Sequence, residues 1–307
     1  MASIVGASGT AQRPFPIAVR TPGVVKVMDE ITSLQNQRVK DAAKLRDARE
    51  RRKQKRFIID GAREISRAID AGIELIEAFI CKPMCDTAES RELLNRLEKL
   101  PVRQSRVTPA VFEKLAFGKR AEGIVAIAAT PNRSLGDLKL PANPLVAVLE
   151  GVEKPGNIGA VLRSADAAGV SALIVADGTT DLHNPNAIRA SLGAVFTVPV
   201  CAAPAAEVRH WLAERRIQTF AARVDGDILY SAADFDRPAA VVLGSEAEGL
   251  SSAWQGESVS TIRLPMRGAV DSLNVSAAAA VLFYEALRQR EASKQTDAKR
   301  QHTSSKR

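Results

Sequence analysis

The 307-residue sequence contains little of what marks membrane or secreted proteins. No stretch approaches the roughly 18 consecutive apolar residues that a transmembrane helix needs, and the N-terminus has no continuous apolar region with a cleavage site. The three cysteines, Cys81, Cys85 and Cys201, are an odd number in a long chain. This argues against a disulfide framework and for a reducing compartment. We therefore expect a cytoplasmic protein that does not contact a membrane.

Motifs for metals and for the common nucleotides are also missing. Cys81 and Cys85 are not spaced as C-x-x-C, and none of the three histidines, His183, His210 and His302, is near them in the sequence. No G-x-G-x-x-G follows the first strand expected in either domain, and G-x-x-x-x-G-K-[ST] does not occur. We therefore expect no bound metal, and we disfavour a Rossmann dinucleotide enzyme or a P-loop nucleotidase.

Length and composition favour a folded protein of two domains. A chain of 307 residues usually holds two domains, and 46% hydrophobic residues suffice to fill two cores. The net charge of +8 is concentrated, because residues 46–56 and residues 288–307 each contain seven basic and two acidic side chains. Both segments suit a phosphate backbone, since each neutralised phosphate releases counterions. The second segment could equally be a solvated, frayed tail.

The first 130 residues are expected to form a leader and a small domain. Residues 1–28 show no sustained hydrophobic period and are expected to be a flexible leader, excluded from the fold. Residues 29–130 alternate apolar strands with amphipathic helices, which predicts a small three-layer α/β sandwich. The expected elements are, in order, a charged helix at 33–56, a strand at 57–60, a helix at 61–72, a strand at 73–80, a helix at 88–100, a strand at 101–104, a helix at 108–117 and a strand at 123–129.

A second domain is expected after a proline-punctuated linker. The linker spans 131–143, where no amphipathic period survives, and the second domain spans 144–290, followed by a basic flexible tail at 291–307. Apolar strands separated by helices predict an open sheet paired in parallel through right-handed crossovers. Its expected strands are 145–150, 172–176, 197–200, 218–222, 240–244 and 261–266, with a last helix from near Asn274 to Arg288.

The segment LEGVEKPGNIGAVLRSADAAG at 149–169 has the character of an active-site corner. An apolar strand leads through a glycine-containing turn into a helix that contains Asn157 and Arg163. Glycines allow close approach of a ligand, and a guanidinium meets a phosphate or a developing oxyanion in fixed geometry. The alternative for Arg163 is a surface helix residue paired with Asp166 three positions later.

Two later segments place polar residues at a strand end and at a helix start. In VVLGSEAEGLS at 241–251, Glu246 comes just after a buried strand, where open α/β sheets bind ligands. In IRLPMRGAVDSLNVSAAAAVLFYEAL at 262–287, Ser272 and Asn274 lie where the free amides of a helix start accumulate. The alternative for Glu246 is a carboxylate at a helix N-terminus that stabilises the helix dipole. The alternative for Ser272 and Asn274 is an N-cap, which is compatible with a role in the site.

Together, these three segments resemble the motifs of the SpoU (TrmH-type) branch of the SPOUT superfamily, which methylates RNA from S-adenosylmethionine. The resemblance covers most of residues 145–290. It implies a parallel α/β domain with a deep trefoil knot that forms the pocket for S-adenosylmethionine, and a homodimer whose active sites draw on both chains. An exposed apolar face on the helix at 275–287 would be consistent with such an interface.

The resemblance also implies roles for individual residues. Arg163 is expected to activate the ribose 2′-hydroxyl, as a base or, as we prefer for a guanidinium of pKa above about 12, by electrostatic or phosphate-assisted stabilisation. The expected catalytic residues are Arg163, Asn157, Glu246, Ser272 and Asn274. The expected cofactor-binding residues are Leu243, Gly244, Leu264, Met266 and Leu273.

The first domain resembles the substrate-binding domain that often precedes SpoU catalytic domains and that is similar to an L30e-like ribosomal-protein RNA binder. The resemblance covers residues 31–128. Charge alone would indicate only an accessory domain with a basic helix, so the RNA assignment comes from the resemblance. The expected RNA-binding residues are Arg46, Arg49, Arg51, Arg52, Lys53, Lys55 and Arg56.

The expected reaction is 2′-O-methylation of a ribose in structured RNA. Ribosomal RNA is preferred over tRNA by analogy, because a separate N-terminal domain suits a large folded target. A housekeeping enzyme and an antibiotic-resistance enzyme would look alike. Three alternatives remain: a tRNA ribose methyltransferase, a base N-methylase of another SPOUT branch, and a non-catalytic RNA-binding or assembly factor that retains the fold.

Overall fold

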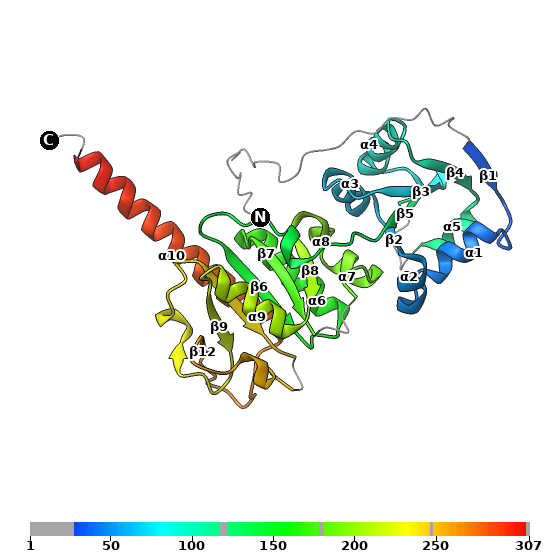
Figure 1. Ribbon diagram of the computed structural model, residues 1–307. Coiled ribbons are helices and arrows are strands. Elements are labelled where there is room, and N and C mark those ends of the chain that lie inside the picture. Colours follow the sequence, from blue (N-terminus) through cyan, green and yellow to red (C-terminus); the bar gives the residue numbers. More distant parts are fainter. Residues whose placement is uncertain (1–27, 117–121, 178–180, 246–247, 305–307) are drawn as a thin grey trace.

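The computed structural model describes the backbone of residues 28–304 except 117–121, 178–180 and 246–247, and side chains from 29 to 296. It consists of two α/β units joined by an extended segment that contains one short 3₁₀ turn at Leu135–Asp137 (Figure 1). The leader expected at 1–28 lies outside the described residues except for Met28, which begins the first strand. None of the described helices is both long enough and apolar enough to cross a membrane.

The N-terminal unit is a five-stranded mixed sheet with helices packed on it. The sheet order is β1-β4-β3-β5-β2, in which β5 runs antiparallel to both of its neighbours. The strands are β1 (Met28–Ile31), β2 (Arg56–Asp60), β3 (Leu75–Ile80), β4 (Arg103–Val107) and β5 (Ile124–Ala129). The helices are α1 (Gln37–Lys44), α2 (Ala48–Gln54), α3 (Ala62–Asp70), α4 (Ala88–Leu97) and α5 (Pro109–Leu115).

The charged helix expected over 33–56 is wrong as a single element, because the structure contains two helices there. Helix α1 ends at Lys44, and Asp47 caps the start of α2 by accepting hydrogen bonds from the amides of Arg49 (2.8 Å) and Glu50 (3.1 Å). Aspartate is among the strongest N-caps, so it favours a new helix start over continuation. Helix α2 then ends at Gln54, and the residue that follows it, Lys55, adopts the left-handed conformation with φ of 51°.

The C-terminal unit is a seven-stranded, fully parallel sheet in the order β10-β12-β9-β11-β6-β7-β8. The strands are β6 (Leu145–Glu150), β7 (Ala172–Ala176), β8 (Val200–Ala203), β9 (Gln218–Ala222), β10 (Ile228–Leu229), β11 (Ala239–Leu243) and β12 (Val259–Arg263). The helices are α6 (Pro155–Ala168), α7 (Pro185–Ala190), α8 (Ala194–Thr197), α9 (Ala205–Glu214) and α10 (Val275–Ser304). The expected α/β fold with a parallel sheet is therefore confirmed.

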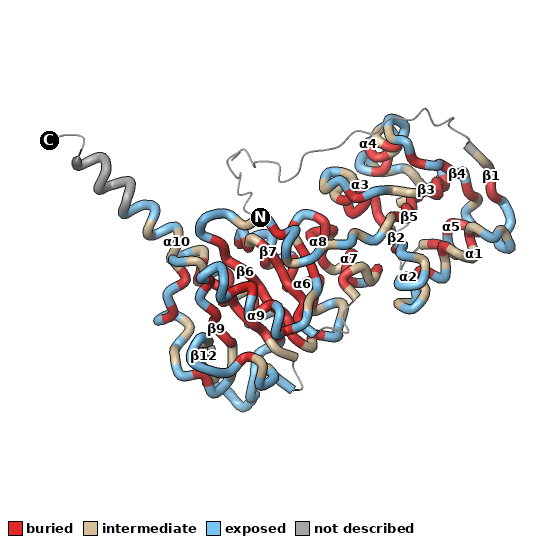
Figure 2. Tube along the Cα trace, viewed as in Figure 1, coloured by how far each residue is buried: buried red, intermediate tan, exposed pale blue. Residues whose placement is uncertain are grey.

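Helices cover both faces of this sheet, and Figure 2 shows that its central strands are largely buried. Alternate residues of β6 enter two separate cores: Leu145, Ala147 and Leu149 pack with α6 and α10, whereas Val146 and Val148 pack with α9. Such alternation is the consequence of the two-residue period of a strand. All six residues of β6 are buried, which explains why its sequence is a continuous apolar run ending in one glutamate.

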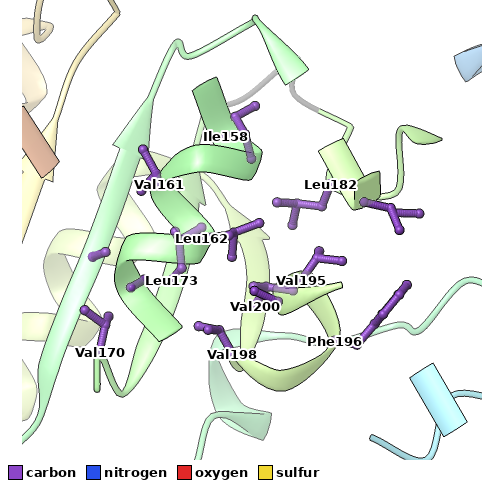
Figure 3. Close-up of a cluster of buried hydrophobic side chains, with 14 of the residues drawn as sticks. Ile158, Val161, Leu162, Val170, Leu173, Leu182, Val195, Phe196, Val198 and Val200 are labelled. Carbon is purple, nitrogen blue, oxygen red and sulfur yellow. The ribbon is translucent and has the colours of Figure 1, made fainter. Parts of the chain in front are cut away.

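One hydrophobic core continues across the two units. Ile158, Val161 and Leu162 of α6 pack in the same cluster as Phe196 of α8 (Figure 3), and this cluster also includes Phe57 of β2. The rings of Phe57 and Phe196 stack with their centroids 5.9 Å apart. The N-terminal unit is therefore packed against the C-terminal unit and not only tethered to it.

Three expected elements of the C-terminal unit differ in position or length. The strand expected at 197–200 begins only at Val200, because residues 194–197 form α8. The strand expected at 261–266 starts two residues earlier and ends at Arg263. Helix α10 continues to Ser304, so residues 291–304 of the expected flexible tail are helical and project from the body of the protein (Figure 1).

Candidate active site

A cavity of about 500 Å³ opens at the carboxyl ends of three adjacent strands, β9, β11 and β12. Its walls come from residues 222–225 after β9, from the loop after β11, from residues 262–266 at the end of β12, and from residues 271–282, which lead into α10. Ligands of open α/β sheets bind at this edge, and small-molecule sites commonly have volumes of about 300–1,000 Å³. The strand ends thus assemble one site from four separate stretches of chain.

The residues expected to bind the cofactor are brought together here. Leu243, Gly244, Leu264, Met266 and Leu273 all line the cavity. Leu243 belongs to the buried end of β11, whereas the side chain of Leu273 is 41% exposed. One side of the cavity is therefore rigid core and the other is open to solvent.

Gly244 is required by the tight loop that follows β11. A Cβ atom at Gly244 would collide with the backbone carbonyl of Gly249 and would lie 2.7 Å from the amide of Leu250. Ser245 and Gly249 exchange backbone hydrogen bonds of 3.1 Å, which close the loop. Only glycine therefore fits at position 244 while the loop stays closed. Glu246, expected to be catalytic, lies outside the described residues.

Glu150 at the end of β6 holds the far side of the same loop, and the sequence analysis did not identify it. Its carboxylate accepts hydrogen bonds of 2.8 Å from both the amide and the hydroxyl of Ser251, and its side chain is buried. A buried carboxylate must be hydrogen-bonded to offset its desolvation. The sequence signal that could have identified Glu150 is its position as the one charged residue at the end of an otherwise apolar strand.

Asn157 and Asn274 meet beside the cavity although they are far apart in the sequence. The Nδ2 atom of Asn274 donates a hydrogen bond of 3.3 Å to Oδ1 of Asn157. Asn274 also caps α10, since its Oδ1 accepts from the amide of Ser276 at 3.0 Å. Ser272, two residues earlier, lines the cavity. Asn157 lies inside the first turn of α6, which begins at Pro155.

Arg163 is not among the residues that line the cavity of this chain. It lies six residues after Asn157 in α6, so it is rotated by about 240° and displaced by about 9 Å along the helix. Its side chain is exposed. Asp166, the partner considered for it, accepts a hydrogen bond of 2.7 Å from the hydroxyl of Thr197. The guanidinium is thus presented on the outer surface of α6.

Charged residues after β9 also line the cavity, and the sequence analysis missed them. Arg223 forms a two-point ion pair with Asp225, with Nε and Oδ1 2.9 Å apart. The hydrogen bond from Arg223 lowers the pKa of Asp225. Glu248 and Asp271 contribute two further carboxylates to the lining. The rule that found Glu246, a polar residue directly after a buried strand, would also have selected Arg223.

The basic segment at 46–56 is divided by the structure into an exposed and a buried part. Five of its basic side chains extend into solvent from α2 and the residues that follow it: Arg49, Arg52, Lys53, Lys55 and Arg56. Arg46 is also exposed, and it donates to the carbonyls of Lys114 and Ala116. Arg51 is only 3% exposed, so its assignment as an RNA-binding residue is wrong. A buried guanidinium with protein partners cannot also contact a phosphate.

Two family models match the chain. Residues 144–284 match the SpoU rRNA methylase family, and residues 36–126 match an MRM3-like substrate binding domain. A 23S rRNA (uridine(2479)-2′-O)-methyltransferase of Streptomyces viridochromogenes is 32% identical over 243 residues, which are 76% of this chain and 83% of that protein.

Solved structures share the architecture. A crystal structure of an RNA 2′-O ribose methyltransferase has 42% sequence identity and a TM-score of 0.73, over 85% of this chain and 99% of that one. An AdoMet-bound rRNA methyltransferase from Sinorhizobium meliloti has 26% identity and a TM-score of 0.77, over 85% of this chain and 98% of that one. On these matches, the chain belongs to the SpoU rRNA methylase family.

Proposed function

We propose that this protein transfers the methyl group of S-adenosylmethionine to the 2′-hydroxyl of a ribose in ribosomal RNA. The observation that carries the proposal is the cavity at the ends of β9, β11 and β12, with its glycine-formed loop and the Asn157–Asn274 pair beside it. The similar protein of Streptomyces viridochromogenes is named as a 23S rRNA 2′-O-methyltransferase, which supports both the atom and the class of RNA.

The cavity suits the proposed cofactor. S-adenosylmethionine, when bound, supplies an electrophilic methyl group on a positively charged sulfur. The backbone at Gly244 can hold the nucleoside closely, because no side chain intervenes there. Arg223 and Arg263 also line the cavity and Asp225 is paired with Arg223, so it is Glu248 and Asp271 that match the positively charged sulfur in sign. These residues can be substituted without altering the basic residues of 46–56 that are proposed to bind RNA.

The proposed role of Arg163 is to stabilise negative charge that develops on the ribose oxygen. A guanidinium keeps its proton at neutral pH, so it acts by charge and hydrogen bonding more readily than as a base. Asn157 and Asn274 orient the substrate near the methyl group, Ser272 contacts the cofactor or the substrate, and Glu246 positions the arginine. The exposed location of Arg163 on α6 favours an active site completed by a second chain.

A homodimer formed through α6 and α10 is part of the proposal. Along α10, Ala277, Val281 and Tyr284 are exposed at spacings of four and three residues, which places them on one face. Val281 is 39% and Tyr284 51% exposed. An exposed apolar stripe on a helix packed against the one that carries Arg163 is suited to self-association.

Four further features complete the proposed picture. The loops around the cavity form a trefoil knot, in keeping with the return of α10 to pack on α6. The N-terminal unit is an L30e-like domain that binds RNA through the exposed basic residues of 46–56. Catalysis is proposed to need no metal, because the methyl group of the positively charged sulfur is already electrophilic. The protein acts in the cytoplasm, where its unpaired cysteines stay reduced.

The test is methyl transfer to ribosomal RNA from a strain that lacks the gene. A 2′-O-methyl group blocks alkaline cleavage at the modified nucleotide, so the product is mapped as a gap in the alkaline ladder. Exhaustive chelation should leave the rate unchanged. A product that alkali still cleaves would indicate base methylation, and transfer to tRNA alone would support the tRNA alternative.

A further inference from the structure

Arg51 lies at the contact between the two units, inside the most basic segment of the chain. Its Nε donates a hydrogen bond of 2.7 Å to Oδ2 of Asp181, and its Nη2 also donates to that oxygen. The remaining nitrogen donates to the carbonyls of Leu45 (2.6 Å) and Arg46 (2.7 Å) in the turn before α2. The guanidinium therefore joins the base of α2 to a carboxylate 130 residues away in the C-terminal unit.

Neighbouring contacts reinforce this junction. The backbone amide of His183 donates 3.0 Å to Oδ1 of Asp181, so both carboxylate oxygens are held. The His183 ring lies against the ring of Phe57 in β2, with centroids 4.5 Å apart. Farther along the contact, Arg67 of α3 donates 2.7 Å to the carbonyl of Leu192. Both ends of the interface thus combine an arginine from the N-terminal unit with an acceptor from the C-terminal unit.

The segment that contains Asp181, the partner of Arg51, leads into α7, which packs directly on α6. Asp181 precedes α7, and α7 packs on α6 at Gly159, where a Cβ atom would lie 2.9 Å from the carbonyl of Ala187 and 2.8 Å from the amide of Ser191. Such close packing leaves no room for the two helices to shift relative to each other. Gly159 lies between Asn157 and Arg163, so the position of α7 is transmitted to both residues.

We propose that the Arg51–Asp181 pair is a positioning device that fixes the exposed basic face of α2 relative to α6, and thereby sets which nucleotide of a bound RNA reaches Arg163. The inference rests on the proposed function, in which α2 binds RNA and Arg163 acts on ribose. Two adjacent arginines of α2 thus have different roles in this proposal. Arg52 is exposed and binds RNA, whereas Arg51 is buried and sets the distance from the bound RNA to Arg163.

The test compares three arginine-to-methionine variants that retain most of the side-chain volume. Arg51→Met should lower the single-turnover rate at saturating RNA roughly ten- to hundredfold, as expected for a misplaced substrate, and should spread methylation to neighbouring nucleotides. RNA affinity and its salt dependence should stay within twofold of the wild type. Arg52→Met should instead weaken RNA binding and reduce the log–log salt slope by about 0.7–0.9.

Arg96→Met is the matched control. Arg96 forms an ion pair with Asp70 within the N-terminal unit, so Arg96→Met should leave RNA affinity, rate and product position unchanged. Asp181→Asn tests the other partner with a smaller change. It should reproduce the rate loss and the scattered product, and combining it with Arg51→Met should cause little further loss, because both act on one contact.

A direct readout of orientation separates positioning from general destabilisation. Spin labels at positions 92 and 210, on exposed residues of α4 and α9, report the distance between units in the full-length protein with Cys85 replaced by Ser. The distance distribution should be broader in Arg51→Met than in Arg96→Met, at equal cofactor affinity.

Two outcomes would overturn the proposal. If Arg51→Met flattened the salt slope as Arg52→Met does, with product position intact, Arg51 would be a phosphate contact. If both interface variants bound RNA and methylated one nucleotide at the wild-type rate, the pair would be packing only. Failure of the wild-type protein to methylate ribose, or unchanged slopes in Arg52→Met, would instead reject the proposed function on which the inference rests.

Discussion

Asn274 hydrogen-bonds Asn157 across 117 residues of sequence, with 3.3 Å between Nδ2 of the former and Oδ1 of the latter. The same Asn274 side chain caps α10 through its oxygen. One amide therefore has two separable functions: the oxygen caps the helix that forms a wall of the cavity, and the nitrogen contacts a residue of α6. The two functions can be tested independently.

Replacing Asn274 by Ser should separate the cap from the contact with Asn157. Serine caps helices as well as asparagine does but is too short to reach Asn157, so stability should change by less than about 0.5 kcal/mol. Losing one neutral hydrogen bond should lower the methylation rate roughly three- to tenfold. Asn274→Ala should show the same rate loss and, in addition, cost about 1 kcal/mol of stability in urea unfolding. Equal rates for wild type and Asn274→Ser would remove the contact from the mechanism.

Gly244→Ala should abolish tight cofactor binding, because the new methyl group collides with the backbone of the loop that closes at Gly249. We expect at least a tenfold loss of affinity in calorimetry. The control is Gly156→Ala in the first turn of α6, where no atom lies within 4 Å of the added methyl group. That variant should bind the cofactor normally and gain about 0.5–1 kcal/mol of stability. Normal binding by Gly244→Ala would mean that the cofactor occupies a different site.

Arg163→Ala should lower the single-turnover rate of methyl transfer by roughly two to three orders of magnitude, the loss expected for one electrostatic donor. Cofactor affinity should barely change, since Arg163 is not part of the cavity lining. Arg163→Lys should recover little, because a point charge cannot replace the planar fork. The rate is measured at saturating RNA by resistance of the product to alkali. A near-normal rate in Arg163→Ala would exclude this arginine from catalysis.

Tyr284→Asp should convert the proposed dimer into monomers, because it puts a charge into the apolar stripe of α10. Sedimentation equilibrium should then give a mass near 32.9 kDa, the mass of one chain. Leu34→Asp, at an exposed apolar residue of the N-terminal unit, is the control and should leave the mass unchanged. If wild type already sediments as a monomer, the dimer part of the proposal fails.

Acidification should weaken the interface around His183. Burial lowers the pKa of His183 to about 4; the charge of Asp181 acts against this shift, whereas the charges of Arg133 and Arg51 lower the pKa further. The unfolded chain binds this proton near pH 6.5 and the folded chain only near pH 4, so unfolding becomes easier as the pH falls between these values. The loss is at most about 3 kcal/mol.

Urea unfolding at pH 7.5 and at pH 5 measures this loss. In His183→Phe, which keeps a ring next to Phe57 but cannot be protonated, the difference between the two pH values should shrink. An identical pH dependence in both proteins would show that other groups titrate.

The parts of the structure that the sequence predicted well are those set by local pattern. Strands such as β6 and β11 are continuous apolar runs because both of their faces are buried, and a polar residue at the end of such a run marks the functional edge of the sheet. The second motif places Leu243 and Gly244 at the cavity for this reason, and the third motif reaches the same cavity through Leu264 after β12 and Leu273 before α10.

What the sequence could not predict depends on distant partners. Seven basic residues crowd into 46–56, and nothing local distinguishes Arg51, whose partner Asp181 is 130 residues away. The effect of a strong local cap was underestimated as well. The charge pattern predicted one helix over 33–56, but Asp47 caps the start of a second helix within that segment. Arg290 is a third case: it was counted with the basic residues of 288–307, but its guanidinium donates to the carbonyls of Asn143, Pro144, Phe235 and Arg237.

The walls of the cavity all come from residues after 221, whereas Asn157 and Arg163 precede them by about 60 residues or more. Because a ribosome makes the chain from its N-terminus, the basic surface of α2 and the arginine of α6 are synthesised before any part of the cavity. Residues 271–282, which supply its last wall, are synthesised more than 100 residues after Arg163. A chain that stops after α6 would therefore carry both of the features proposed to contact RNA, whereas the proposed pocket for the methyl donor needs the segment through residue 282.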